Sequence, residues 1–360
     1  MRKDYIDNLR WIGILLLVPY HAAMAWNVWG EPNYIYFKSN PLISSIVVFL
    51  SPYFMPAMFL ISGISARSAL EKRTVWQFVI ERFKKLLIPL FWGTVLLMPW
   101  MGYLADRFNY NYKGGVFRHS IIFFTRFTDF TGSDGGFSLG QFWFLAYLFV
   151  ISMLAVGIIC VQRNILSEKI IPEKIMLEKK NGFPLIGICF LGLPLPFLSS
   201  LLSVSGKSLA EFTYIFLTGY YLFSKDAVIS KIEKYKWFFL CIGLTATVIH
   251  VDLVVWPARQ NAHVLLPAKC TSEWFMCIAL LGIGKRYLNA AGKIAGFMSQ
   301  RSYSFYIFHY IWVVLFQSAC YPVCGNHTLL LFVLPVILAY GATFLCCEIR
   351  RIMDQGLFVL

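Results

Sequence analysis

The chain has 360 residues, of which 58% are hydrophobic and 14% are charged, and its mean hydropathy is +0.65. Soluble domains carry about 25% charged residues, so this composition excludes a soluble protein and predicts an all-α polytopic membrane protein. The net charge of +14 comes from short basic segments between apolar runs. This arrangement indicates contact with anionic membrane lipids and does not favour a nucleic-acid-binding protein.

The apolar runs predict ten transmembrane helices with both termini in the cytoplasm. The segments assigned to the inner side hold 24 of the 32 lysines and arginines, and such an excess marks cytoplasmic loops. We therefore expect a multi-pass protein of the cell membrane, with one integral-membrane domain over 1–350 and a short cytoplasmic tail over 351–360. The predicted spans are about 10–29, 42–65, 86–104, 141–161, 184–203, 209–224, 237–256, 270–284, 302–321 and 328–347.

The first span contains Arg10 and His21 with only uncharged residues between them. In an α-helix these eleven steps make almost three turns and roughly 16 Å, so both side chains project from one face. If Arg10 lies at the inner boundary of a ~30 Å hydrocarbon core, His21 lies near its middle. Asp7, three residues before Arg10, is placed to orient the guanidinium. A histidine at this depth indicates a functional site, although a structural hydrogen bond to another helix also explains it.

Two basic residues precede the third span, in the inner loop that runs from Arg67 to Lys85. Apolar residues recur in this loop at helical spacing, which predicts an amphipathic helix lying on the inner surface. Arg82 and Lys85 share its polar side, at the mouth of the third span. Basic groups in this place suit the phosphates of a donor, and lipid anchoring is the equally good alternative.

Other chemistry-bearing residues lie in the second, fourth and ninth spans. The Ser62-Gly63 pair indicates first a close approach of two helices and only second a role in a functional site. A long outer loop, about 105–140, leads to Trp143 at the start of the fourth span and is typical of a lid or binding surface. Tyr303 and His309 lie in the ninth span. The nine cysteines are scattered without metal-ligand spacing, so we expect no metal site.

These features together resemble the integral-membrane acyltransferase 3 family. Arg10 and His21 match its basic-x10-His signature, and Phe59 to Ile64 is similar to its Phe-x-x-Ser-Gly segment. Arg82 to Lys85 is similar to its Arg-x-x-Arg motif, with lysine at the second arginine position. Trp143-Phe144-Leu145 resembles its Trp-aromatic-Leu segment, and Ser302-Tyr303-Ser304 followed by His309 resembles its Ser-Tyr-…-His span. The nearest likeness is to the glucan biosynthesis protein C branch.

The resemblance implies transfer of an acyl group, commonly acetyl or succinyl, from cytoplasmic acyl-CoA to a hydroxyl of an envelope carbohydrate, with no further cofactor. His21 is then a general base or a covalent acyl carrier, and Arg10 neutralises an oxyanion or a donor phosphate. Asp7 orients Arg10, while Arg82 and Lys85 bind the donor. The residues expected to line the site are Ser62, Trp143, Tyr303 and His309. A proton-coupled transporter or flippase is the alternative, although we find no inverted repeat.

Overall fold

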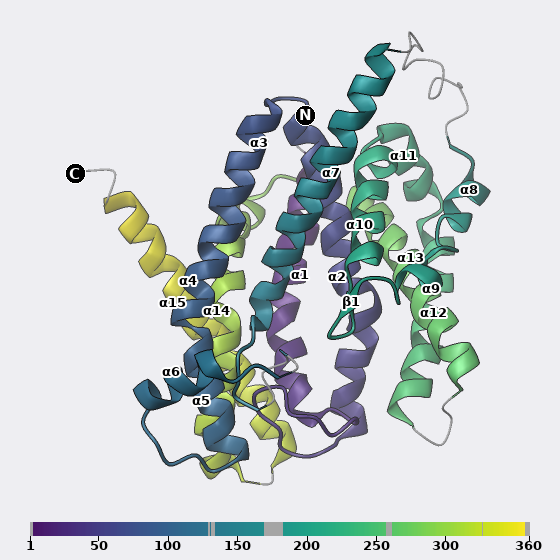
Figure 1. The fold of residues 1–360 in the computed structure, drawn as a ribbon. Helices are drawn as coiled ribbons and strands as arrows, with labels where there is room; N and C mark the ends of the chain where they lie inside the picture. Colours follow the sequence, from purple (N-terminus) through teal and green to yellow (C-terminus); the bar gives the residue numbers. More distant parts are fainter. Residues whose placement is uncertain are drawn as a thin grey trace.

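The computed structural model describes residues 3–128, 130, 134–168, 183–256, 261–325 and 327–356. This part of the chain is almost entirely α-helical, which confirms the predicted fold class. Eight helices within it are long and apolar enough to cross a membrane, and they form a bundle (Figure 1). They are Asp4–Trp26, Pro41–Leu70, Val75–Asn109, Gly140–Gln162, Lys236–Val255, Ala262–Tyr287, Lys293–Cys324 and Thr328–Asp354.

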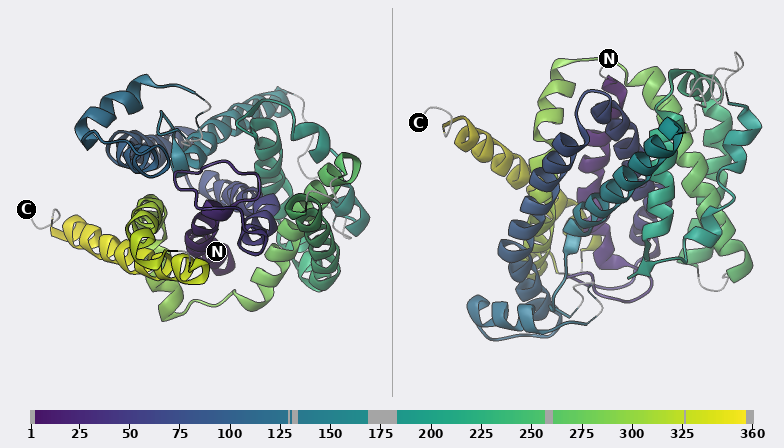
Figure 2. Two further views of the ribbon diagram at one scale, coloured as in Figure 1. Left: turned by 90° about the horizontal axis from the view of Figure 1, so that it is seen from below. Right: turned by 45° about the horizontal axis from the view of Figure 1, so that its top comes forward.

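The first helix, α1 (Asp4–Ala23), runs through the middle of the bundle and ends in a short turn, η1 (Met24–Trp26) (Figure 2). The helices that pack around it are α2 (Pro41–Leu70), α13 (Ala262–Tyr287), α14 (Lys293–Cys324) and α15 (Thr328–Gly356). The amino terminus and the end of α15 lie toward the same end of the bundle (Figure 1), in agreement with the predicted topology. The helix α15 continues past residue 350 to Gly356, and the division into a domain over 1–350 and a tail over 351–360 stays a prediction.

The predicted surface helix before the third span is wrong, because this segment is the beginning of the span itself. The run comprises α3 (Val75–Arg82), a π-helical turn η2 (Phe83–Leu87), α4 (Ile88–Leu96) and α5 (Met98–Asn109). Thr74 and Gln77 form a capping box that starts the helix. After this cap the chain continues through η2 into α4 without a loop, so α3 stands along the bundle and does not lie flat on the inner surface (Figure 1).

The predicted fifth and sixth spans are too short to cross a membrane. Prolines 194 and 196 interrupt the fifth, since proline cannot donate a helical hydrogen bond. At ~1.5 Å per residue, each segment covers about 22 Å of a ~30 Å hydrocarbon core. Their elements are α8 (Leu185–Phe190), α9 (Leu195–Leu198), the strands β1 (Ser203–Val204) and β2 (Lys207–Ser208), α10 (Leu209–Thr218) and the π-helical turn η4 (Gly219–Phe223).

Two glycines allow α2 to cross α10 and η4 at close range. A Cβ atom on Gly63 would lie 2.0 Å from the carbonyl oxygen of Phe216. A Cβ atom on Gly219 would lie 2.4 Å from the carbonyl oxygen of Leu60. The prediction that the Ser62-Gly63 pair permits close helix approach is therefore confirmed.

The remaining helices complete the two sides of the bundle. On one side, α6 packs against α5, and the turn η3 leads into α7; on the other, α11 and α12 pack against α13. The eighth predicted span is therefore a full-length helix despite its glutamate. The bounds are α6 (Val116–Thr125), η3 (Gly140–Phe142), α7 (Trp143–Glu168), α11 (Asp226–Lys234) and α12 (Lys236–Val255).

Candidate active site

One face of α1 lines a cavity of about 680 Å³. Arg10, Gly13, Ile14 and Leu17 follow one another along this face, and their spacing of three or four residues is that of successive helical turns. His21 lies one turn beyond Leu17 on the same face. The predicted alignment of Arg10 with His21 is therefore confirmed, and the cavity leads from the level of Arg10 toward His21.

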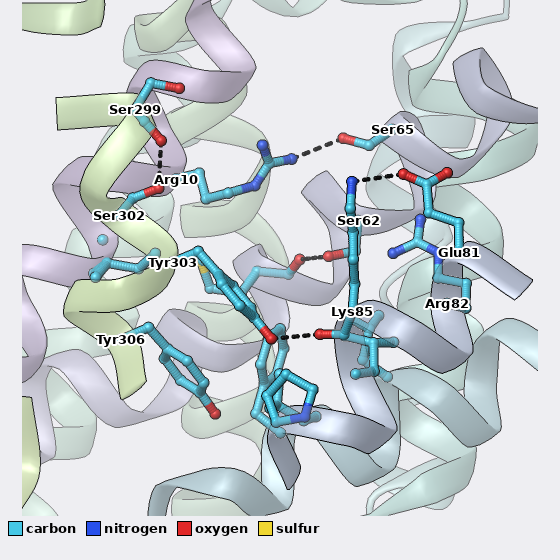
Figure 3. A pocket seen from close by; sticks show the side chains of 18 of the residues that line it. Arg10, Ser62, Ser65, Glu81, Arg82, Lys85, Ser299, Ser302, Tyr303 and Tyr306 are labelled. Atoms are coloured by element: carbon cyan, nitrogen blue, oxygen red, sulfur yellow. Dashed lines mark hydrogen bonds and ion pairs between the residues drawn. The ribbon is translucent and has the colours of Figure 1, made fainter. Parts of the chain in front are cut away.

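The Arg10 guanidinium is held on two sides. One nitrogen donates to the Asp7 carboxylate at 2.7 Å, and another donates to the Ser65 hydroxyl at 2.9 Å. Figure 3 shows the fork of Arg10 directed toward Ser65 across the pocket. The Ser65 hydroxyl in turn donates to the carbonyl of Ile61 at 2.9 Å, so its lone pairs face the arginine. Two fixed acceptors thus aim the guanidinium along the cavity wall.

Positive charge surrounds the opening of this cavity. Six basic side chains and one carboxylate, that of Glu81, line the part of the wall near the inner end of the helices. Glu81 binds Arg73 and accepts from the ammonium of Lys85 at 2.6 Å, while the Arg82 guanidinium lies 4.7 Å above the Phe78 ring. This excess of charge suits a ligand with several phosphates. The six basic residues are Arg10, Arg73, Arg82, Lys84, Lys85 and Arg350.

Tyr303 bonds to a backbone carbonyl at the cavity opening that a proline leaves without its helical donor. Pro89 has no N–H, so the carbonyl four residues earlier, that of Lys85, has no α-helical donor. The Tyr303 hydroxyl donates to this carbonyl (Figure 3). The bond joins α14 to η2 on the opposite wall of the cavity, so the structure brings Tyr303, Arg82 and Lys85 to one pocket, as predicted.

His21 and His309 lie together one turn past the deep end of the cavity. Their ring centroids are 5.3 Å apart, and His21 stacks on Tyr310 at 3.8 Å. Tyr310 is close to the midpoint of α14, so His21 lies near mid-height in the bundle, as the first span predicted. The Nδ1 of His309 is 2.8 Å from the carbonyl of Tyr306. A carbonyl can only accept, so Nδ1 carries the proton and Nε2 presents its lone pair.

Trp143 does not join the other predicted site residues. Its ring packs against Phe59 and Phe212, and the ammonium of Lys207 lies 5.2 Å from its centroid. Phe144, the next residue along α7, lines the cavity in its place. Ser62 does line the cavity, and its hydroxyl donates to the carbonyl of Met58 at 2.8 Å.

Residues 3–348 match the family model Acyl_transf_3, which is described as an acyltransferase domain. The chain belongs to the acyltransferase 3 family. No curated relative and no solved structure shows significant similarity to the chain. The match covers nearly the whole chain, so this is a membrane acyltransferase with several membrane-crossing helices. Membership of the glucan biosynthesis protein C branch stays a prediction.

The residues of this acyltransferase site that were missed from the sequence include Ser65, Arg73, Lys84 and Arg350. Ser65 follows Ser62 by one helical turn, and this spacing is the signal that could have found it. Arg350 lies on the last helix and has no local pattern that connects it with Arg10. Its place at the mouth depends on how α15 packs, which spacing along the sequence does not show.

Loss of the Ser65 hydroxyl should loosen Arg10 in this acyltransferase. Ser65→Ala leaves the guanidinium with the Asp7 contact but without the acceptor at 2.9 Å. A hydrogen bond to a charged group contributes about 1.5–3 kcal/mol, so we expect donor affinity to fall by roughly tenfold or more. Isothermal titration of the purified protein with CoA measures this. Ser62→Ala is the matched control, because its hydroxyl bonds only to its own helix among the described contacts; an equal loss in both variants would contradict the role given to Ser65.

Proposed function

We propose that this enzyme transfers an acyl group, acetyl or succinyl, from cytoplasmic acyl-CoA to a hydroxyl of an extracytoplasmic carbohydrate. The observation that carries the proposal is one continuous arrangement along α1. A basic opening at Arg10 leads into an apolar cavity, and the His21–His309 pair lies one helical turn past its deep end, at mid-height. Donor phosphates and the transferred carbonyl thus have separate places in a single site.

The cavity wall is basic at the opening and apolar farther in, which matches the phosphates and the uncharged arm of acyl-CoA. Phosphate groups meet the basic side chains at the opening. Deeper in, the wall is formed by apolar side chains that suit the uncharged arm and the acyl group of the donor. These deeper residues include Ile14, Leu17, Phe54, Met58, Phe144 and Leu148.

The distance along α1 supports a donor phosphate, and not an oxyanion, as the group that Arg10 neutralises. Eleven residues at ~1.5 Å each separate it from His21 by about 16 Å, so the two cannot contact the same carbonyl. Arg10 lies instead among the other basic groups of the opening. We assign it to donor phosphate, with Asp7 and Ser65 as the residues that orient it.

At the deep end, His21 acts as the general base. It takes the proton of the acceptor hydroxyl while the hydroxyl oxygen attacks the thioester carbonyl. The new C–O bond forms as the C–S bond breaks, and the CoA thiolate leaves and takes up a proton. The proton that His21 removed from the hydroxyl is the one that the thiolate takes up. Tyr310, stacked on the imidazole, limits its rotation, and the His309 ring lies beside it.

Donor binding should depend on Arg350 and not on its neighbour. Arg350 lines the cavity, whereas Arg351 on the same helix bonds to Glu348 at 2.9 Å. Charge-assisted contacts contribute about 1.5–3 kcal/mol, so Arg350→Ala should weaken CoA binding by roughly tenfold or more. Arg351→Ala should leave it unchanged. Titration with CoA at two salt concentrations measures both; equal effects would exclude Arg350 from the donor site.

The proposal is tested by the turnover of acetyl-CoA and succinyl-CoA by the purified protein in detergent or nanodiscs. We expect slow release of free CoA that accelerates when hydroxyl-rich acceptors are added. A transporter or flippase would bind substrate without releasing CoA. No turnover of either thioester by folded protein, with acceptors present, would refute the acyl-CoA donor.

A further inference from the structure

The loop between η1 and α2 enters the bundle from the outer side and reaches the site. The part of the loop that contacts Tyr310 consists of Asn33, Tyr34 and Ile35, here termed the outer tip. Tyr34 is 1% exposed and Ile35 is fully buried. The Tyr34 ring meets the Tyr310 ring edge-on at 5.3 Å, and Tyr310 is the residue that stacks on His21. Irregular backbone at this depth is tolerated in a membrane protein only where protein surrounds it.

The backbone of the outer tip is strained. Tyr34 has φ = 69°, in the left-handed region that a bulky side chain rarely occupies, and Asn33 forms an isolated bridge with Ile35 across it. Strain of this kind persists only where surrounding contacts enforce it, and it clusters at ligand clamps and switch regions.

Three side chains from other parts of the chain hold the outer tip in place. The Tyr310 hydroxyl donates to Asn33 Oδ1 at 2.8 Å, and Asn109 Nδ2 donates to the Tyr34 carbonyl at 2.7 Å. The Tyr34 hydroxyl donates to Ser138 Oγ at 3.3 Å. These three partners come from α14, α5 and the segment before η3. They therefore form a polar pocket that the outer tip fills.

We propose that the outer tip occupies the acceptor's place beside His21 and withdraws to admit it, an inference that rests on the proposed function. Withdrawal leaves the Tyr310 hydroxyl, the Asn109 amide and the Ser138 hydroxyl facing the vacated space. Sugar hydroxyls donate and accept in turn, so a hydroxyl-rich acceptor satisfies the Tyr310 hydroxyl and the Asn109 amide. It can also donate to Ser138 Oγ, whose own proton is held by the carbonyl of Phe130. The closed tip keeps outer water from the thioester until such an acceptor displaces it.

Tyr34→Gly tests the catalytic consequence, because glycine removes the ring and relieves the left-handed strain. A closed gate is typically open in about 0.1–10% of molecules, so we expect acceptor-independent hydrolysis of acetyl-CoA to rise by at least about tenfold. Tyr34→Phe loses only the bond to Ser138 and should give a smaller rise. Ser205→Gly is the matched control: it relieves the same kind of backbone strain, at φ = 48°, in the β1–β2 hairpin and should change nothing.

A second measurement reports on the outer tip without any turnover. Ser138 is 1% exposed behind it, so Ser138→Cys should react slowly with a membrane-impermeant maleimide applied from outside. Adding Tyr34→Gly should accelerate this labelling by at least about tenfold. Labelling of the nine native cysteines in the parent protein is subtracted.

The two readouts separate the inference from the proposed function. Labelling no faster with Tyr34→Gly than without it overturns the inference, whatever the turnover. Faster labelling without extra hydrolysis, in an enzyme that does release CoA, also overturns it, because the open tip then does not expose the reacting thioester. If the wild type releases no CoA, the proposed function fails while the labelling still decides whether the outer tip is a gate.

Discussion

Replacement of His21 by alanine should reduce the release of CoA from acetyl-CoA by about 100- to 10,000-fold, the range typical of a lost general base. The residue lies beyond the deep end of the cavity and beside His309, so it is within the space where the transferred carbonyl is expected. Its ring stacks on Tyr310 and fills a mid-height position in the bundle. Rates of CoA release by wild type and variant, measured with a thiol reagent, give the ratio.

Two controls separate chemistry from folding and donor binding. His21→Ala should bind CoA with wild-type affinity, since the charged contacts lie about 16 Å away at the level of Arg10. His21→Gln keeps a polar side chain of similar length without a basic nitrogen, and it should be as slow as the alanine variant. A His21→Ala enzyme that folds, binds CoA and turns over at the wild-type rate would exclude the residue from catalysis.

Gly63→Val should strongly destabilise the fold where α2 crosses α10. The first side-chain carbon would lie 2.0 Å from the backbone oxygen of Phe216, and neither backbone can give way without separating α2 from α10. Overpacking in a well-packed core typically lowers the free energy of unfolding by about 1–3 kcal/mol. Because this clash is with backbone, we expect a loss at or above the upper end of that range. Thermal unfolding in detergent, followed by static light scattering or intrinsic fluorescence, measures the loss.

Gly157→Val on α7 is the matched control. A Cβ atom on Gly157 meets no atom within 4 Å, so the same substitution on another membrane helix should change the unfolding temperature little. If both variants unfold at the same temperature, the loss reflects the general effect of valine on a membrane helix and not the α2–α10 crossing.

The long helices and the face shared by Arg10 and His21 could be predicted because hydropathy and helical periodicity are local properties. The third span begins earlier than predicted, since α3 combines helix-forming spacing with too many polar residues to be recognised as part of a crossing segment. The interrupted fifth span carries prolines whose effect on length depends on neighbouring helices.

Only the part of the site that depends on local sequence could be predicted. Arg82 and Lys85 lie near Arg10 because α1 packs on α2 and a turn of four residues joins α2 to α3. Family resemblance supplied His309. Ser65, Arg350 and the outer tip were not found, because each acts through a contact with a distant part of the chain. Nothing in the run Asn33-Tyr34-Ile35 indicates a left-handed tyrosine, since its conformation is imposed by Asn109, Ser138 and Tyr310.

The position of α1 in the centre of the bundle has a consequence for how the protein is made. α1 leaves the ribosome long before α14 and α15, which cover much of its surface. Until then its polar residues, Arg10 and His21 among them, must be shielded by other partners in the membrane, such as α2 or the insertion machinery. Because Arg350 of α15 completes the mouth, no nascent chain that lacks α15 has a finished donor site. Catalytic competence therefore arises only after α15 has been synthesised.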